Sequence, residues 1–182
     1  MAKVHEHITD DFKTWIEAQP MFFVASAPLS ADGHVNLSPK GMDCLRVLDE
    51  HTVAYLDLTG SGNETSAHLR ENGRITLMWC AFEGPPRILR LYGRGRIVLP
   101  DTPEWDELAP LFTLMPGARQ IVVNEVMRVQ TSCGFAVPLM TYESDRDTLI
   151  KYAENKGPDG MVDYRKEKNM TSIDGLPTAF CE

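Results

Sequence analysis

Residues 54–80, AYLDLTGSGNETSAHLRENGRITLMWC, place a polar and flexible turn between an apolar strand and the start of a helix. The pattern predicts a helix over Glu64–Asn72, with Gly73 in the C-terminal capping position and a further strand directly after it. Two interpretations of the turn remain open. With Asn63 as N-cap it is a well-capped helix start, whereas its glycines, hydroxyl side chains and backbone N–H groups are also typical of a phosphate cradle. It is not a P-loop, because no Lys-Ser/Thr pair follows the final glycine.

Short apolar segments lie on both sides of this stretch at roughly ten-residue spacing, which is typical of a β-meander. Strands are predicted in MFFVASAPL (21–29), HVNLSPKG (34–41), CLRVLDEHTVAYLDL (44–58, two strands), RITLMWCAF (74–82), RILRLYGRGRIVL (87–99) and QIVVNEVMRVQTSCGF (120–135). Helices are predicted in ITDDFKTWIEAQP (8–20) and TPEWDELAPLF (102–112). Gly93 and Gly95 indicate a bend in their strand, as the corner of a barrel requires. The expected fold is therefore mainly β with flanking helices, as a barrel or a sandwich.

The length of 182 residues fits a single domain, which buries about two-thirds of its unfolded surface. We expect its core to span residues 20–140 and a tail to occupy residues 142–182. In the tail, Leu149, Ile150 and Tyr152 recur at roughly helical spacing, and a polar, broken ending follows. The tail is expected to form one or two helices and an extended end that lie on the barrel or on a partner subunit.

The composition argues against several classes of function. The 18 basic and 26 acidic residues give a formal net charge of −8 at pH 7, which disfavours nucleic-acid binding. No apolar run approaches the roughly 20 residues of a membrane helix, and the N-terminus lacks the apolar core of a signal peptide, so we expect a cytoplasmic protein. The cysteines form no C-x-x-C pair and the histidines have no metal-binding spacing, so no metal site is expected. Cys133 is expected to be an inert thiol, because no histidine with an orienting acid is marked as its partner.

Two further segments carry candidate binding residues. In HVNLSPKG, alternation gives the strand one polar face, which includes Ser38, and Lys40 stands at its end. Lys40 neutralises a dianion if strand pairing brings it beside Asn63–Ser66, and is solvated surface otherwise. The strand over residues 87–99 carries three arginines on one face, either paired with surface carboxylates or directed at an anionic ligand or a flavin ring: Arg90, Arg94 and Arg96.

The order of these features resembles the pyridoxamine 5′-phosphate oxidase-like family of flavin-binding split β-barrels. A strand ending in SPKG leads through two strands to residues 54–80, and the Gly-bearing strand RILRLYGRGRIV follows. The likeness covers about residues 20–140 and is strongest in AHLRENGRITLMW (67–79). It implies a split β-barrel of the FMN-binding type, and a homodimer that binds FMN in clefts between its subunits. The cofactor-binding residues that it implies are Ser38, Lys40, Gly62, Asn63, Glu64, Thr65, Ser66, Arg74, Trp79 and Arg90.

The chain departs from the true oxidases at two places. They carry an Arg-Lys pair where this chain has Glu64-Thr65, so neutralisation of the phosphate falls more heavily on Lys40, Arg74 or backbone amides. They end with a segment containing tryptophan and arginine that shapes the vitamin site, whereas residues 143–182 contain no tryptophan. We therefore expect an FMN-dependent oxidoreductase acting on a small molecule other than pyridoxamine phosphate. A flavin-binding carrier or sensor without turnover, a deazaflavin-dependent reductase and a barrel with no cofactor remain alternatives.

Overall fold

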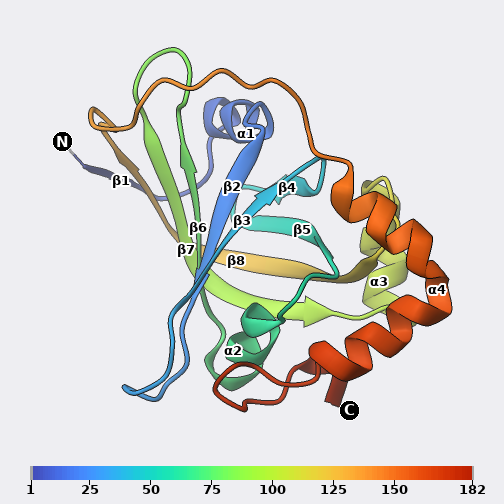
Figure 1. Ribbon diagram of the computed structural model, residues 1–182. Coiled ribbons are helices and arrows are strands. Elements are labelled where there is room, and N and C mark those ends of the chain that lie inside the picture. The colour runs from blue at the N-terminus through green and yellow to red at the C-terminus, as the bar shows by residue number, and fades with distance from the viewer. Residues whose placement is uncertain (1, 182) are drawn as a thin grey trace.

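The computed structural model describes residues 2–181. Within them, eight strands form one antiparallel sheet that curls into a split barrel, with helices around it (Figure 1). The elements in chain order are β1 (Lys3–His5), α1 (Asp10–Glu17), β2 (Met21–Ser26), β3 (Asn36–Gly41), β4 (Leu45–Asp49), β5 (Thr52–Leu58), α2 (Glu64–Asn72), β6 (Arg74–Cys80), β7 (Ile88–Val98), α3 (Pro103–Leu108), the 3-10 turn η1 (Ala109–Leu111), β8 (Ala118–Ser132), α4 (Thr148–Lys168) and η2 (Ala179–Cys181). The expected class of fold is thus confirmed.

The order of the strands in the sheet is β3-β2-β6-β7-β8-β5-β4, and β1 pairs with β8 outside this path. Because β3 lies at an edge, it accommodates Pro39, which has no N–H to donate to a neighbouring strand. The bend expected in β7 is a register shift between Tyr92 and Gly93. A Cβ at Gly93 would lie 2.1 Å from Oδ1 of Asn124, so the sheet closes here only with glycine. The pairing of Lys3–His5 with β8 was not expected from the sequence.

The interior of the barrel differs between its two ends. α1 lies at one end and α2 at the other (Figure 1). The end beside α1, here called the apolar end, is filled by buried hydrophobic side chains: Phe22, Leu77, Trp79, Leu89 and Leu91. The end beside α2, here called the polar end, contains buried polar and charged side chains: Asp57, Asn63, His68, Arg119 and Gln120.

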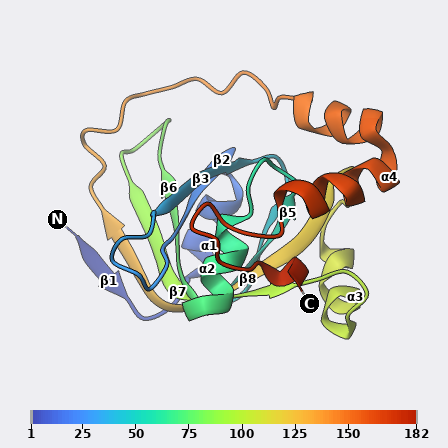
Figure 2. The ribbon, with the colours of Figure 1, turned by 60° about the horizontal axis from the view of Figure 1, so that its bottom comes forward.

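Beyond β8 the chain leaves the sheet. Residues 133–147, here called the connector, contain no helix or strand and cross the upper edge of the barrel in Figure 1 to reach α4. α4 is two helical pieces that meet at Gly157, where φ is 69° and Pro158 follows. Residues 169–181, the C-terminal segment, then return alongside α2 (Figure 2). No helix within residues 2–181 has both the length and the apolar character needed to cross a membrane.

Candidate anion-binding site

The loop before α2 is held at the polar end of the barrel. Both the backbone N–H and Oγ1 of Thr59 donate to the carbonyl of Gly117, each at 2.8 Å. Asn63 occupies the N-cap position, but its side chain caps no backbone N–H; instead its Oδ1 accepts a hydrogen bond from Nε2 of Gln120 at 2.9 Å. The first turn of α2 therefore keeps N–H groups that the usual side-chain acceptor does not satisfy. At the other end of the helix, Gly73 has the predicted left-handed cap conformation, with φ 71°.

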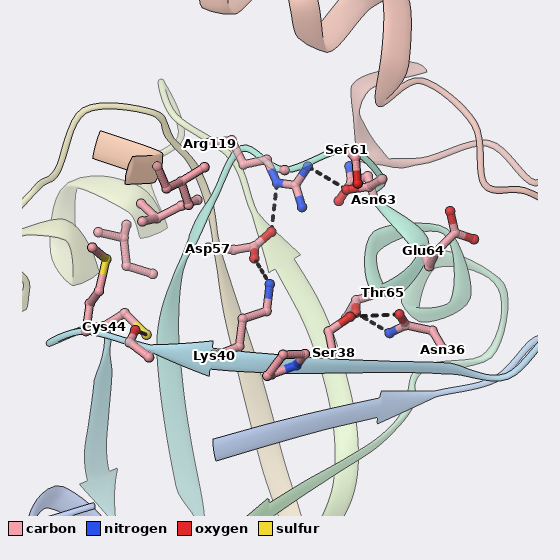
Figure 3. Close-up of a pocket in the computed structure, with 18 of the residues that line it drawn as sticks. Asn36, Ser38, Lys40, Cys44, Asp57, Ser61, Asn63, Glu64, Thr65 and Arg119 are labelled. Carbon is pink, nitrogen blue, oxygen red and sulfur yellow. Dashed lines mark hydrogen bonds and ion pairs between the residues drawn. The ribbon is translucent and has the colours of Figure 1, made fainter. Parts of the chain in front are cut away.

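Asp57, near the end of β5, lies between two basic side chains. Its Oδ1 accepts from Nζ of Lys40 at 2.6 Å, and its Oδ2 accepts from Nε of Arg119 at 2.8 Å (Figure 3). Asp57 is only 2% exposed and Arg119 4%, whereas the side chain of Lys40 is 22% exposed. Burial opposes ionisation of Asp57, but the charges and hydrogen bonds of Lys40 and Arg119 outweigh it and hold the pKa of this carboxyl well below its usual range. We call these three residues the charged cluster.

A pocket of about 570 Å³ opens beside the charged cluster (Figure 3). This volume is typical of small-molecule sites. One wall is polar and comes from β3, the loop and the first turn of α2: Asn36, Ser38, Lys40, Ser61, Asn63, Glu64 and Thr65. Further lining is apolar, here called the apolar wall, and comes from the residue after β3, from β5, from α4 and from the C-terminal segment: Met42, Leu56, Leu58, Leu149 and Ile173. The pocket is thus suited to a ligand with an anionic end and an apolar body.

The polar wall is cross-linked by hydrogen bonds. Nδ2 of Asn36 donates to Oγ1 of Thr65 at 3.0 Å, and Oδ1 of Asn36 accepts from Oγ of Ser38 at 2.9 Å. The carboxylate of Glu64 points away from Lys40 (Figure 3) and accepts from the backbone N–H of Ile173 at 3.1 and 3.2 Å. Because that carboxylate is directed toward the C-terminal segment, the part of the pocket beside Lys40 remains favourable to an anion.

The C-terminal segment fixes the loop from outside. Asn169 is fully buried; its Oδ1 accepts from Nη1 of Arg119 at 2.9 Å, and its Nδ2 donates to the carbonyl of Gly60 at 3.1 Å. Further along, the N–H of Ala179 donates to Oγ of Ser66 at 2.9 Å. The loop is therefore bonded on both sides, to the barrel and to a segment more than 100 residues later in the chain.

The pocket contains no reactive nucleophile among the groups that the structure describes. Cys44 lines it, but burial raises the pKa of the thiol to about 12, and Sγ donates to the carbonyl of Gly41 at 3.2 Å. A neutral thiol of this kind is inert. No set of three His, Cys, Asp or Glu side chains suited to a metal ion occurs within residues 2–181. What this site can do chemically is bind and orient a ligand.

The structure brings most of the predicted site residues together. Those that line the pocket are Ser38, Lys40, Gly62, Asn63, Glu64 and Thr65. Ser66 lies just behind them, fully buried. The other three lie elsewhere: Trp79 is in the apolar end, Arg74 donates to the carbonyl of Pro28 on the outer side of the sheet, and Arg90 donates to Ser132. Alternation along β6 explains the position of Trp79, since it shares the inward face with the buried Leu77.

Several residues of the site were missed from the sequence. Asp57 had a signal, because it is a single acid within the otherwise apolar strand AYLDL, and a buried charge needs a partner. Arg119 directly precedes a β-branched strand, where an arginine is more often surface. Asn36 was recognised only as part of a polar face. Asn169 lies in a polar segment whose path the sequence does not reveal.

The fold and the pocket together define a split β-barrel protein with a candidate site for an anion beside the first turn of α2. A family model described as pyridoxamine 5′-phosphate oxidase matches residues 8–133. A pyridoxamine 5′-phosphate oxidase family protein of Aspergillus flavus, ustO, is 38% identical over 192 aligned residues, which cover 95% of this chain and 76% of that protein. The chain therefore belongs to the pyridoxamine 5′-phosphate oxidase family, as its resemblance implied.

Solved structures support the fold. HupZ of Group A Streptococcus superposes with a TM-score of 0.55 at 22% identity, covering 69% of this chain and 99% of that one. A Lactobacillus delbrueckii protein assigned as a pyridoxamine 5′-phosphate oxidase has a TM-score of 0.52 at 19% identity, covering 69% of this chain and 94% of that one. At these identities the similarity concerns the split-barrel architecture alone.

Proposed function

We propose that this protein is an FMN-binding flavoprotein and an oxidoreductase on a small molecule, with the pocket beside α2 as its cofactor site. The observation that carries the proposal is the convergence of Lys40 and the first turn of α2 on one pocket. A cation, hydroxyl groups and a helix N-terminus are together what a phosphate monoester requires. Membership of the pyridoxamine 5′-phosphate oxidase family supports the choice of a flavin.

The donors of the polar wall fit a phosphate group. Lys40, Ser38, Ser61 and Thr65 all line the pocket. The charged cluster contains two cations and one carboxylate, so it keeps one net positive charge while Asp57 holds Lys40 in place. We assign the phosphate of FMN to this wall.

The apolar wall fits an aromatic ring. Met42, Leu58, Leu149 and Ile173 supply it from four different parts of the chain. Met42 has φ 67°, in the region that favours glycine, which costs on the order of 1–3 kcal/mol and is found mainly at ligand and active sites. We assign the isoalloxazine ring to this side of the pocket.

When bound, FMN supplies transfer of a hydride or of two electrons. The residues of the chain bind it, orient it and limit the access of water. Lys40 and the first turn of α2 hold the anionic end, and the C-terminal segment fixes the loop through Asn169. No residue of the chain needs to form a covalent bond, which agrees with the neutral thiol of Cys44.

We further propose that residues 1–182 form one flavin-binding domain and that the protein is a homodimer with the flavin at the subunit interface. Such a dimer is what the family resemblance implies. The substrate is proposed to be a small molecule reached through the open side of the pocket.

The first test is the visible absorption spectrum of the purified protein, with mass spectrometry of whatever heat releases from it. Release of FMN supports the proposal, and release of a deazaflavin keeps the pocket but changes the cofactor to an obligate hydride carrier. A colourless protein that does not bind added FMN contradicts the proposal. Steady-state oxidation of reduced nicotinamide by the FMN-loaded protein then separates an oxidoreductase from a non-catalytic flavin-binding module.

A further inference from the structure

The connector exposes several large apolar side chains. Phe135 is 81% exposed and Leu139 79%, and Met140 and Tyr142 are also exposed. A stretch of this length without helix or strand is uncommon in a compact domain and is usually functional. The backbone N–H of Met140 donates to the carbonyl of Phe82 at 3.0 Å, so the connector is held against its own barrel while its side chains face outward. Exposed apolar surface of this kind marks an interaction site.

A groove of about 440 Å³ lies on the outer face of the sheet, where β2, β6 and β7 pair. Its rim includes two apolar side chains that are each 73% exposed, Val35 and Met127. Among the described residues that line the groove, the charged ones are both arginines, Arg74 and Arg94. The groove is thus apolar and basic.

The connector is complementary to this groove. It is apolar around Leu139 and then acidic, with three carboxylates and one arginine: Glu143, Asp145, Asp147 and Arg146. Opposite charge steers association and fixes the register of an interface, while its buried apolar centre provides most of the affinity. The apolar residues of the connector are complementary to the apolar rim of the groove, and its acidic residues are complementary to the two arginines.

The connector and the groove of one molecule lie apart. In Figure 1 the connector crosses the upper edge of the barrel, whereas the β2–β3 hairpin, which carries Val35 at the groove, extends from the lower edge. In Figure 2 the connector runs over the top of the view to α4, whereas the hairpin lies below it. A connector that is bonded to its own barrel at Met140 therefore reaches only the groove of another molecule.

We propose that the occupant of the groove is the connector of a second copy of this chain. A two-fold axis then repeats the contact, so that each subunit gives one connector and one groove to the dimer. This assignment names the contact surfaces of the proposed homodimer and rests on that part of the proposed function, but not on the identity of the cofactor.

The test is light scattering on the full chain during size-exclusion chromatography, over a dilution series. Leu139→Glu in the connector and Met127→Glu in the groove are each expected to raise the dimer dissociation constant tenfold or more, because symmetry removes two contacts at once. Val162→Glu, on an exposed apolar position of α4, is the matched control and is expected to leave the constant unchanged. Circular dichroism of each variant checks that the fold is retained.

Charge reversal tests the pairing itself. Asp145→Arg and Arg94→Glu are each expected to weaken the dimer, and the double variant is expected to recover part of the loss. A wild-type chain that is monomeric throughout, a dimer unaffected by both glutamate variants, or a double variant without recovery overturns the assignment. Absorption in the same chromatogram reports the flavin separately. A coloured monomer contradicts the dimer and the interface position of the flavin but not the cofactor, and a colourless dimer contradicts only the cofactor.

Discussion

The two ends of the barrel interior achieve burial in opposite ways. At the apolar end, Phe22 stacks on Trp79 with ring centroids 5.6 Å apart, and no charge is enclosed among the described side chains that fill this end. At the polar end, Asp57 and Arg119 are equally buried, and their ion pair rarely stabilises more than apolar packing of the same volume. The apolar end therefore provides the stability of the fold. The polar end is an arrangement that packing alone does not require, and it lies where the pocket opens.

Among the variants that test this difference between the two ends, the largest loss of stability is expected from Trp79→Ala. Removing a fully buried tryptophan from the apolar end is expected to lower the free energy of unfolding by about 3–5 kcal/mol, because a cavity is left behind. Urea denaturation measures the loss. The flavin affinity of the folded protein is expected to stay unchanged, and a parallel loss of affinity would show that the two ends are not independent.

Asp57→Asn removes the buried negative charge at the polar end. It leaves Lys40 and the buried Arg119 without their carboxylate, and breaking such a pair costs about 3–5 kcal/mol. The matched control is Asp43→Asn, whose carboxylate pairs with Arg46 but is 70% exposed, so about 1 kcal/mol or less is expected. Equal losses in the two variants would mean that burial does not distinguish these ion pairs.

The same carboxyl gives the protein a pH dependence. Because the pKa of Asp57 is lowered in the folded state, its stabilisation is fully present above the ordinary value of 3.8 and is lost as the pH falls below that value. The free energy of unfolding of the wild type is therefore expected to fall more steeply below about pH 4 than that of Asp57→Asn. Denaturation curves at several pH values measure the two slopes, which should differ.

Lys40→Ala tests ligand binding at the polar end, because it is expected to lower the affinity for FMN more than the stability of the fold. Asp57 keeps Arg119 and Gln120 as donors, so the fold is expected to survive. A charge-assisted contact contributes about 1.5–3 kcal/mol, so FMN affinity is expected to fall tenfold or more. Titration with FMN followed by fluorescence measures it, and Lys40→Arg, which keeps the charge, should lose less. Unchanged affinity in Lys40→Ala would contradict the placement of the phosphate.

The smallest effect is expected at the outer rim, where Nδ1 of His34 and Oδ1 of Asp174 lie 2.7 Å apart. The pair raises the pKa of His34 above 6.5 and lowers that of Asp174 below 3.8. The ion pair between His34 and Asp174 is thus fully formed at intermediate pH, and it weakens as the pH rises through the raised pKa of His34. The protection factor of the Ile173 amide, which is its hydrogen exchange relative to the intrinsic base-catalysed rate, should fall at the higher pH in the wild type and should stay constant in Asp174→Asn.

Local chemistry made much of the fold predictable. The bounds of α2 follow from Asn63 and Gly73, and the strands follow from apolar runs between turn residues. Long-range register was not predictable in the same way. Trp79 was assigned to the cleft although alternation with Leu77 turns it inward, since the sequence does not say which face of β6 closes the barrel.

The polar end was predictable only in part, for the same reason. Lys40 and Thr65 belong to short sequence motifs that predict a phosphate site. Asp57 and Arg119 come together only through the pairing of β5 with β8. The side chain of Asn63 donates to the backbone carbonyl of Asn169, which lies 106 residues later in the chain. No local pattern marks a contact over that distance.

That separation also orders events during biosynthesis. The strands and α2 leave the ribosome well before Asn169, at about 5–20 residues per second. For several seconds the loop from Gly60 to Asn63 thus has its partners in the barrel as they emerge, but not the bonds from the later segment. Cofactor loading is therefore expected to follow translation of the C-terminal segment, and the nascent barrel spends that interval open to chaperones.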